Sequence, residues 1–259
     1  MLLHKPVYFM LTALLMLTLA CGGGDETAST EGQAVETESY FEVDSETAAT
    51  VTGTVILEGN APRNPRINMS AEPDCHGLHT GAVRAEVVLV GEGGTLGNTF
   101  VWVKSGLEGK KFRTPSDSVA LDQKGCIYSP HVLGLQTRQK LAVSNSDPTT
   151  HNVHPLPKIN REWNKSQTAD APAIERSFSR QEIMMPVKCN IHPWMRSYIN
   201  VVEHPFFAVT GADGSFELKG LPPGTYTIEA VHERFKSQEI SVTIGASESK
   251  KIDFSYKAG

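Results

Sequence analysis

The sequence lacks the marks of several common classes of protein. Basic residues do not gather in a patch interleaved with aromatic residues, so we do not expect nucleic acid as a partner. No sustained helical period occurs, which excludes an all-helical fold. The apolar run from Val7 to Ala20 is too short to span a bilayer comfortably. No motif indicates a small-molecule substrate, and we therefore do not expect an enzyme.

Positive charge is missing from one region. Residues 22–49 contain eight acidic residues and no Lys or Arg, although the whole chain carries a net charge of only -5. The rest of this region is mainly Gly, Ser, Thr and Ala, which leaves little apolar surface to bury. The composition predicts an acidic, disordered tether over residues 22–49.

The N-terminal apolar run has the features of an export signal. Lys5 precedes the run and Cys21 ends it. Thr18-Leu19-Ala20-Cys21 resembles the lipobox of bacterial lipoproteins, although Thr18 stands where an aliphatic residue is usual. The resemblance implies a signal peptide over residues 1–21, lipidation of Cys21, and an anchored protein that faces the periplasm. Gly22 favours the outer membrane as its destination; a plain secretory signal and an uncleaved anchor are the alternatives.

Cysteine is scarce, with four residues in the chain. Export places Cys75, Cys126 and Cys189 in an oxidising compartment, and an odd number leaves at least one of them outside a disulfide. If Cys189 holds a metal, parity alone leaves Cys75 and Cys126 as a candidate disulfide. The alternative is that these two are buried free thiols.

Short alternating segments separated by Gly and Pro turns predict strands over most of the remaining chain. The clearest segments are Val51–Leu57, Arg84–Val90, Thr99–Lys104, Ala208–Thr210, Ser215–Leu218, Thr225–Val231, Ser237–Ile244 and Lys250–Tyr256. Such spacing is typical of a β-sandwich. The chain, at 259 residues, is long enough for one large or two small domains, and we predict an all-β fold.

The C-terminal part resembles a known family. TGADGSFELKGLPPGTYTIEAVHE lies within residues 206–257 and is similar to the carboxypeptidase regulatory-like domain, a transthyretin-like β-sandwich. VTGTVILEGNAP, from residue 51, resembles the first strand of such a domain, and residues 98–104 resemble its second strand. No metal ligands typical of the peptidase are recognisable, so the resemblance implies a scaffold and not hydrolysis.

This resemblance implies a divided domain. We expect the regulatory-like sandwich to consist of residues 50–106 and 205–259, with residues 107–204 inserted between its two parts.

Residue types that bind metals are concentrated in the stretch Cys189-Asn190-Ile191-His192-Pro193-Trp194-Met195. Soft sulfur ligands with imidazole favour copper, and two His, one Cys and a weak Met form the site of blue-copper electron carriers. A second His is expected upstream, at His151 or His154. Residues three apart in an extended segment face opposite sides, so both are not expected to reach one metal.

The inserted segment resembles a cupredoxin, the family of blue type 1 copper proteins of the amicyanin and plastocyanin type. The matching motifs are His-Asn-Val-His at residues 151–154 and Cys-x-x-His-Pro-aromatic-Met-Arg at residues 189–196, within a resemblance over about residues 118–203. It implies an inserted Greek-key sandwich with a single copper. The implied ligands are His151, Cys189, His192 and an axial Met195. Asn152 is implied to tie the ligand loops together and to donate a backbone hydrogen bond toward the Cys189 sulfur.

Two alternatives concern the metal. A zinc site built from His151, His154, Cys189 and His192 has legitimate ligand types, but it leaves Met195 without a role. Copper also binds nitrogen and sulfur ligands more tightly than zinc does. Without any metal, these residues would serve only as packing.

The same stretch suggests where a redox partner docks. An apolar collar is predicted around the edge of His192, with Pro193 and Trp194 as its main members. Its other members are Met184, Met185 and Pro155. The alternative is that Trp194 and the two Met residues fill the sandwich core.

These patterns together predict an exported, lipid-anchored electron carrier. The resemblance implies a periplasmic dehydrogenase or a cytochrome as the redox partner. Copper delivery or storage is one alternative, and a structural cell-surface module stapled by a metal is another. A nitrite reductase is disfavoured because the sequence offers no second set of three His for a catalytic copper.

Overall fold

The computed structural model describes residues 39–259. The predicted signal peptide, Cys21 and most of the predicted tether therefore lie outside the described residues. Within residues 39–259, no helix is long and apolar enough to cross a membrane. The prediction of an all-β chain is confirmed, because the described residues form strands with only two very short helices.

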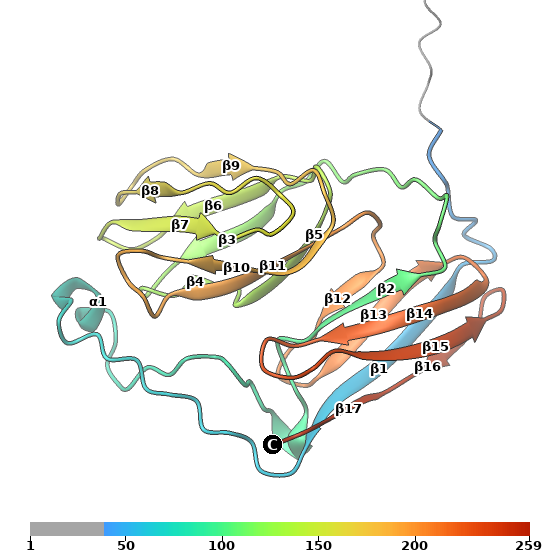
Figure 1. The fold of residues 1–259 in the computed structure, drawn as a ribbon, viewed down its shortest axis with the longest axis horizontal. Coiled ribbons are helices and arrows are strands. Elements are labelled where there is room, and N and C mark those ends of the chain that lie inside the picture. Colours follow the sequence, from blue (N-terminus) through green and yellow to red (C-terminus); the bar gives the residue numbers. More distant parts are fainter. Residues whose placement is uncertain (1–38) are drawn as a thin grey trace, which may run out of the picture. The chain divides into compact units, whose positions relative to one another are not determined.

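The first sandwich has two four-stranded sheets (Figure 1). In one sheet the central strand β1 (Ala49–Glu58) pairs with β13 (Ser215–Leu221), β16 (Ser249–Lys251) and β17 (Phe254–Lys257). The other sheet has the order β12 (Phe207–Val209), β2 (Phe100–Ser105), β14 (Gly224–Val231) and β15 (Gln238–Ile244).

Alternation of apolar and polar residues explains why these segments form strands around a core. In β1 every second residue is buried, including Val51, Val55 and Leu57. Tyr226 and Ile228 of β14 point into the same core. Burial of a side chain of this size contributes about 1.5–3 kcal/mol, so the inward face of each strand stabilises the fold.

The second sandwich contains the predicted metal ligands, in strand β7 and in the loop between β10 and β11. One sheet has the order β5 (Val132–Gln136), β11 (Arg196–Val202), β10 (Glu182–Lys188), β7 (His151–Pro155) and β8 (Lys165–Gln167). The facing sheet has the order β4 (Tyr128–Ser129), β3 (Val119–Gln123), β6 (Leu141–Asn145) and β9 (Ile174–Arg176). Cys189 and Met195 lie in the same buried cluster as Leu121, Leu141 and Ile199.

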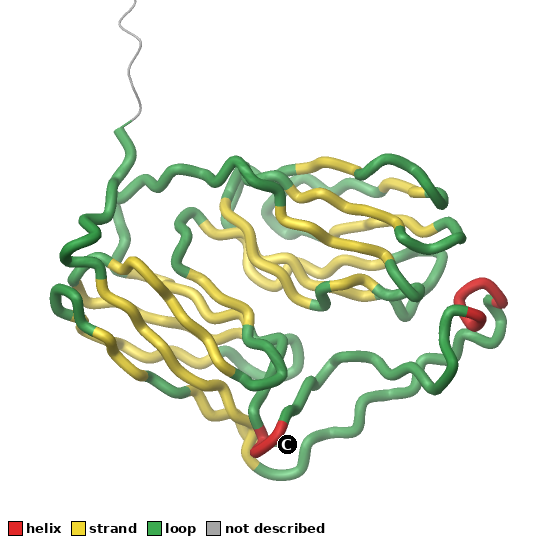
Figure 2. The backbone as a smooth tube through the Cα atoms, turned by 180° about the vertical axis from the view of Figure 1, so that it is seen from behind, coloured by secondary structure: helices red, strands yellow, loops and turns green. Residues whose placement is uncertain are grey.

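The second sandwich is inserted in the sequence of the first. Strands β2 and β12 pair directly, with Trp102 opposite Phe207, although all the strands of the second sandwich lie between them in the chain. This is the divided arrangement that the sequence predicted, while the domain limits at residues 107 and 204 stay a prediction. Figure 2 shows the two sets of strands from the opposite side.

The two sandwiches share an apolar junction. Phe100, Trp102, Val132 and Val202 form a buried cluster that contains residues of both. Gly134 of β5 lies so close to the first sandwich that an added Cβ would be 2.6 Å from the ring of Phe207. A glycine is therefore required at this point for the sheets to approach.

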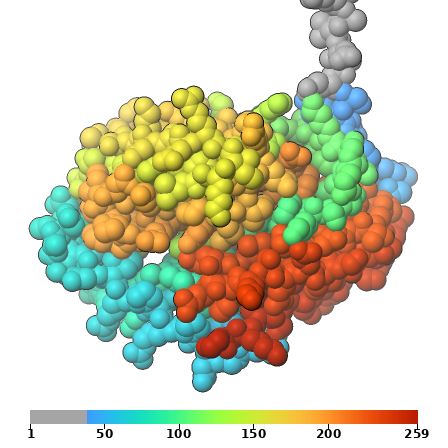
Figure 3. All heavy atoms as spheres, in the orientation of Figure 1, coloured from blue at the N-terminus to red at the C-terminus, as the bar shows by residue number. Residues whose placement is uncertain are grey.

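Residues 59–99 link β1 to β2 and are called the arm here. The arm contains helix α1 (Pro73–Gly77) and the 3-10 helix η1 (Glu92–Gly94). The predicted strand Arg84–Val90 is wrong, because this part of the arm makes only isolated bridges, such as that between Arg66 and Arg84. Figure 3 shows the arm, in cyan, lying against both sandwiches.

The predicted disorder of the tether is also wrong at its C-terminal end. Phe41 donates a backbone hydrogen bond to Lys111 (2.7 Å) and packs against the edge of Phe112. Ala49, the first residue of β1, is buried in the first core. The aromatic residue explains the error, because Phe41 gives an otherwise polar segment enough apolar surface to dock.

Candidate metal centre

Strand pairing brings the predicted ligands together. Strand β7 runs antiparallel to β10, with His154 opposite Lys188. The first residue of β7, His151, therefore lies beside the loop that follows β10, where Cys189 and His192 are found. The Nδ1 atoms of His151 and His192 are 2.8 Å apart, and Cys189 Sγ is 3.9 Å from His192 Nδ1.

The three side chains form a compact buried group. Their ligand atoms all lie within 4.8 Å of one another, and His151, Cys189 and His192 are 0%, 1% and 2% exposed. Ligands bound about 2.0–2.3 Å from one ion must lie this close together. The residues therefore fit a copper or zinc ion without a large rearrangement.

The loop after β10 is closed by its own backbone. The N–H of Cys189 donates to the carbonyl of Met195 (3.3 Å), and the N–H of Met195 donates to that of His192 (2.9 Å). The N–H of His192 in turn donates to Cys189 Sγ (3.3 Å). These bonds fix the loop before any metal binds, and Met195, at 1% exposed, is held within it.

Asn152 ties this loop to β7. Its side-chain Oδ1 accepts a hydrogen bond from the N–H of Asn190 (2.6 Å) and lies 3.3 Å from Cys189 Sγ. The hydroxyl of Tyr128 donates to the carbonyl of Asn152 (2.5 Å). Asn152 therefore joins the ligand loop to β7 through its side chain.

His154 lies outside the group. Its Nδ1 is 3.2 Å from Asn190 Oδ1, and its Nε2 is 2.6 Å from a carboxylate oxygen of Glu162. Alternation along β7 turns it away from His151, as expected for residues three apart. The alternative zinc site of one Cys and three His therefore lacks one of its four ligands.

Asp147 is a residue that the sequence reasoning missed. Its Oδ2 accepts a hydrogen bond from His151 Nε2 (2.8 Å), which leaves Nδ1 of His151 directed toward His192. The carboxylate also accepts the backbone N–H groups of Gly125 (2.6 Å) and Cys126 (2.7 Å). A carboxylate behind a ligand His fixes the tautomer and orientation of its ring. Asp147 lies four residues before His151, but this spacing alone does not indicate that its side chain turns back to the ring.

Hydrogen bonds set the ionisation of the group. Burial lowers the pKa of His151, but its hydrogen bonds to Asp147 and Cys189 outweigh burial and raise it to about 9. Burial raises the pKa of Cys189, but hydrogen bonds from His151 and from three backbone N–H groups lower it overall. Burial, followed by the charge of His151, lowers the pKa of His192. Without metal the group therefore favours a thiolate at Cys189, a neutral ring at His192 and a protonated ring at His151, and a metal that binds His151 would displace that proton.

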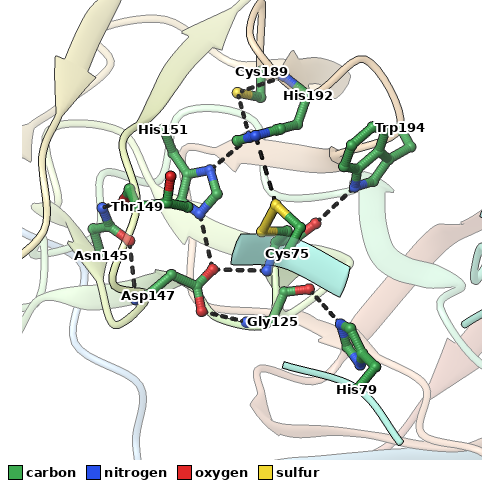
Figure 4. Close-up of a disulfide and its surroundings, with 11 residues drawn as sticks. Cys75, His79, Gly125, Asn145, Asp147, Thr149, His151, Cys189, His192 and Trp194 are labelled. Atoms are coloured by element: carbon green, nitrogen blue, oxygen red, sulfur yellow. Dashed lines mark hydrogen bonds and ion pairs between the residues drawn. A yellow bond between two sulfur atoms is a disulfide. The ribbon is translucent and has the colours of Figure 1, made fainter. Parts of the chain in front are cut away.

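The arm reaches this centre through a disulfide. Cys75 and Cys126, paired in the prediction on parity alone, form a disulfide bond of 2.02 Å, which excludes the alternative of two free thiols. Cys75 Sγ lies 3.6 Å from Nε2 of His192. Figure 4 shows His192 between Cys189 on one side and the Cys75 sulfur on the other.

The predicted docking collar needs correction. The ring edge of His192 does not reach the surface, because Cys75 covers Nε2 and Trp194 lies beside the ring at 5.2 Å between centroids. The indole N–H of Trp194 donates to the carbonyl of Cys126 (3.0 Å), and Pro193 is exposed. Of the other predicted collar members, Met185 and Pro155 are buried and so cannot contact a partner at the surface.

Comparisons with known proteins separate the two parts of the chain. Residues 199–257 match the family model of the carboxypeptidase regulatory-like domain. This match confirms the resemblance predicted over residues 206–257. No curated protein matches the sequence.

Solved structures that resemble part of the chain include cupredoxins. A purple cupredoxin from Nitrosopumilus maritimus is 17% identical over 32% of this chain and 98% of its own, with a TM-score of 0.28. The reduced form of an amicyanin variant is 17% identical over 39% of this chain and 97% of its own, with a TM-score of 0.30.

A copper-containing nitrite reductase (NirK) from Thermus scotoductus SA-01 is 16% identical over 39% of this chain, with a TM-score of 0.32. The match spans only 25% of the length of that reductase.

Proposed function

We propose that the protein carries single electrons through one type 1 copper, which His151, Cys189, His192 and Met195 would hold. The observation that supports this most directly is the buried group of two Nδ1 atoms and one Sγ within 4.8 Å of one another. Thiolate and thioether suit Cu(I), and imidazole suits both oxidation states. When bound, copper supplies one-electron exchange.

The surrounding residues would keep this ligand set rigid. Asp147 orients the ring of His151, and Asn152 joins the ligand loop to β7. Because the loop is closed by its own hydrogen bonds, little movement would accompany a change of charge at the centre. Small movement favours rapid electron exchange over storage of the metal in a loose site.

Burial supports a carrier over an enzyme or a copper donor. None of the four proposed ligand side chains is more than 2% exposed, so neither a substrate molecule nor a second copper protein would meet a ligand atom at the surface. Electrons need no such direct contact. A redox protein, such as a dehydrogenase or a cytochrome, is therefore the proposed partner, and Pro193 and Trp194, which follow His192 in the loop, are the proposed docking residues.

We also propose that the protein is exported and anchored by a lipid at Cys21, facing the periplasm from the outer membrane. The sequence around Cys21 supports the anchor, and residues 22–38 are long enough to serve as a tether. The Cys75–Cys126 disulfide supports an oxidising compartment. The regulatory-like sandwich would act as a scaffold for the inserted centre.

The visible spectrum of the purified protein after addition of Cu(II) tests the proposed centre. We expect an intense blue band from thiolate-to-copper charge transfer, which Cys189→Ser abolishes because it removes the thiolate. His154→Ala is the matched control and should keep the band, since His154 faces Asn190 and Glu162. A colourless oxidised protein would refute the proposal.

A further inference from the structure

The arm is rooted in the first sandwich and ends at the metal centre of the second. Val88 and Leu96, in the returning half of the arm, belong to the first core. Met69 and Cys75, at its far end, belong to the buried cluster of the second. In between, the N–H of Ile67 donates to the carbonyl of Val83 (3.0 Å), which holds the two halves of the arm side by side.

The far end of the arm contacts His192, one of the proposed ligands. Nδ1 of His192 faces His151, and Nε2 of the same ring faces Cys75 Sγ at 3.6 Å. With Cys75 on this edge and Trp194 beside the ring, His192 is 2% exposed. The arm therefore covers the Nε2 edge of the ring, on the side of His192 away from Cys189 (Figure 4).

Few other contacts fasten this end of the arm. Helix α1 has five residues and no side-chain hydrogen bond at its N-cap, and Leu78, which follows it, is 41% exposed. Apart from apolar packing, the clearest non-covalent contact is the hydrogen bond between His79 Nε2 and the carbonyl of Gly125 (2.8 Å). The covalent bond to Cys126 joins residues 51 positions apart. It is the strongest constraint on the position of the arm.

The attachment point is itself part of the centre. The N–H of Cys126 donates to the carboxylate that holds His151, and the carbonyl of Cys126 accepts from the indole of Trp194. The disulfide thus links the arm to residues on both sides of the ligand group. Its sulfurs belong to residues that are 0% exposed, which slows the attack of reductants from solution on the bond.

We infer that the Cys75–Cys126 disulfide latches the arm over His192, so that metal enters or leaves the centre only when the arm is lifted. The inference rests on the proposed metal centre and adds a control of exchange to it. Metal then loads fastest before the disulfide closes, enters the closed protein only slowly through rare lifting of the arm, and is retained there. Local opening of a loosely packed segment is the step that the latch suppresses.

Labelling of Cys189 in the metal-free protein tests the latch without any metal. Wild type and the Cys75→Ser/Cys126→Ser double variant are treated with a maleimide, and modification of the peptide containing Cys189 is followed by mass spectrometry. We expect labelling at least about tenfold faster in the double variant, because the arm opens more often. Equal rates in two folded proteins would overturn the inference.

A second measurement guards against a double variant that does not fold. The wild-type disulfide is reduced under native conditions with a phosphine, which takes up an oxygen from water to become the phosphine oxide as the two thiols form. Cys189 labelling should accelerate after reduction and slow again after reoxidation. Slow labelling of Cys189 while Cys75 and Cys126 are both modified would also overturn the latch.

Copper release separates this inference from the proposed function. Wild type and the double variant are each loaded with Cu(I) and mixed with a Cu(I) chelator. We expect copper to leave the double variant at least about tenfold faster. Equal release from both proteins refutes the latch and leaves the copper centre intact. If neither protein binds copper, the proposed function fails, and the labelling of Cys189 still decides on the latch. His79→Ala keeps the disulfide and should release copper at the wild-type rate.

Discussion

At the scale of single residues, the local sequence indicates which residue types form the centre. It does not indicate which other residues hold them in position. Cys189, His192 and Met195 lie in one loop, so their proximity could be predicted from spacing alone. Asp147 could not, because its role depends on how the turn before β7 folds back on His151. The contact between Cys75 and His192 joins positions far apart in the chain, and no local pattern indicates it.

Asp147 gives a prediction at this scale. Asp147→Asn keeps the shape of the side chain but weakens the charge-assisted hydrogen bond to His151 Nε2. Removal of such a partner typically lowers metal affinity about 10–100-fold, and we expect a loss in this range. Competition with a chelator of known affinity measures it. Asp122→Asn is the control, because Asp122 bonds Ser144 and Ser146 and no proposed ligand; an equal loss in both variants would contradict the assigned role.

At the scale of elements, alternation of residues identified most strands of the first sandwich, and it failed in the arm. Residues 84–90 have β-branched residues at strand-like intervals, yet they pair with nothing beyond isolated bridges. Val88 instead serves to root the arm in the first core. A segment of suitable composition becomes a strand only where a partner strand is available, and partners are determined by the whole topology.

Gly134 gives a prediction for the junction of elements. Gly134→Ala places a methyl group 2.6 Å from the ring of Phe207, inside a packed cluster that cannot easily move. We expect the free energy of unfolding to fall by about 1–3 kcal/mol, the usual cost of overpacking. Denaturation by guanidinium measures it. Gly81→Ala is the control, because an added Cβ at Gly81 meets nothing within 4 Å; a similar loss there would contradict the argument.

At the scale of the whole molecule, the divided architecture could be predicted because the stretch from residue 51 resembles the first strand of the family whose model matches residues 199–257. The packing of one sandwich against the other could not. It depends on a few buried aromatic and aliphatic residues, such as Phe100 and Val202, whose patterns resemble those of ordinary core positions.

Buried histidines make the stability of the molecule depend on pH. Burial lowers the pKa of His204 from 6.5 to about 4, although its Nε2–H donates to the carbonyl of Val103 (2.8 Å). Between these values the unfolded chain binds more protons than the folded chain, so stability falls as the pH drops from 6.5 to 4 and this contribution is lost below that window. Its size is at most about 3 kcal/mol.

Chemical denaturation at several pH values measures this effect. His204→Gln should flatten the dependence between pH 6.5 and 4, because Gln does not titrate in this range. Burial also lowers the pKa of His232 to about 4. His232 should therefore cause the pH dependence of stability that remains in His204→Gln. An unchanged slope in His204→Gln would show that other groups cause the loss of stability in acid.

The pairing of β1 with β13, β16 and β17 has a consequence for the order in which the molecule forms. A chain made from its N-terminus presents β1 first and its partners last, whereas β3 to β11 follow one another without interruption. The second sandwich can therefore complete its strand pairing before the final strands of the first sandwich have been made. During that interval the base of the arm has no finished core to pack against, so we expect the arm to leave the ligand group uncovered more often than it does in the complete fold.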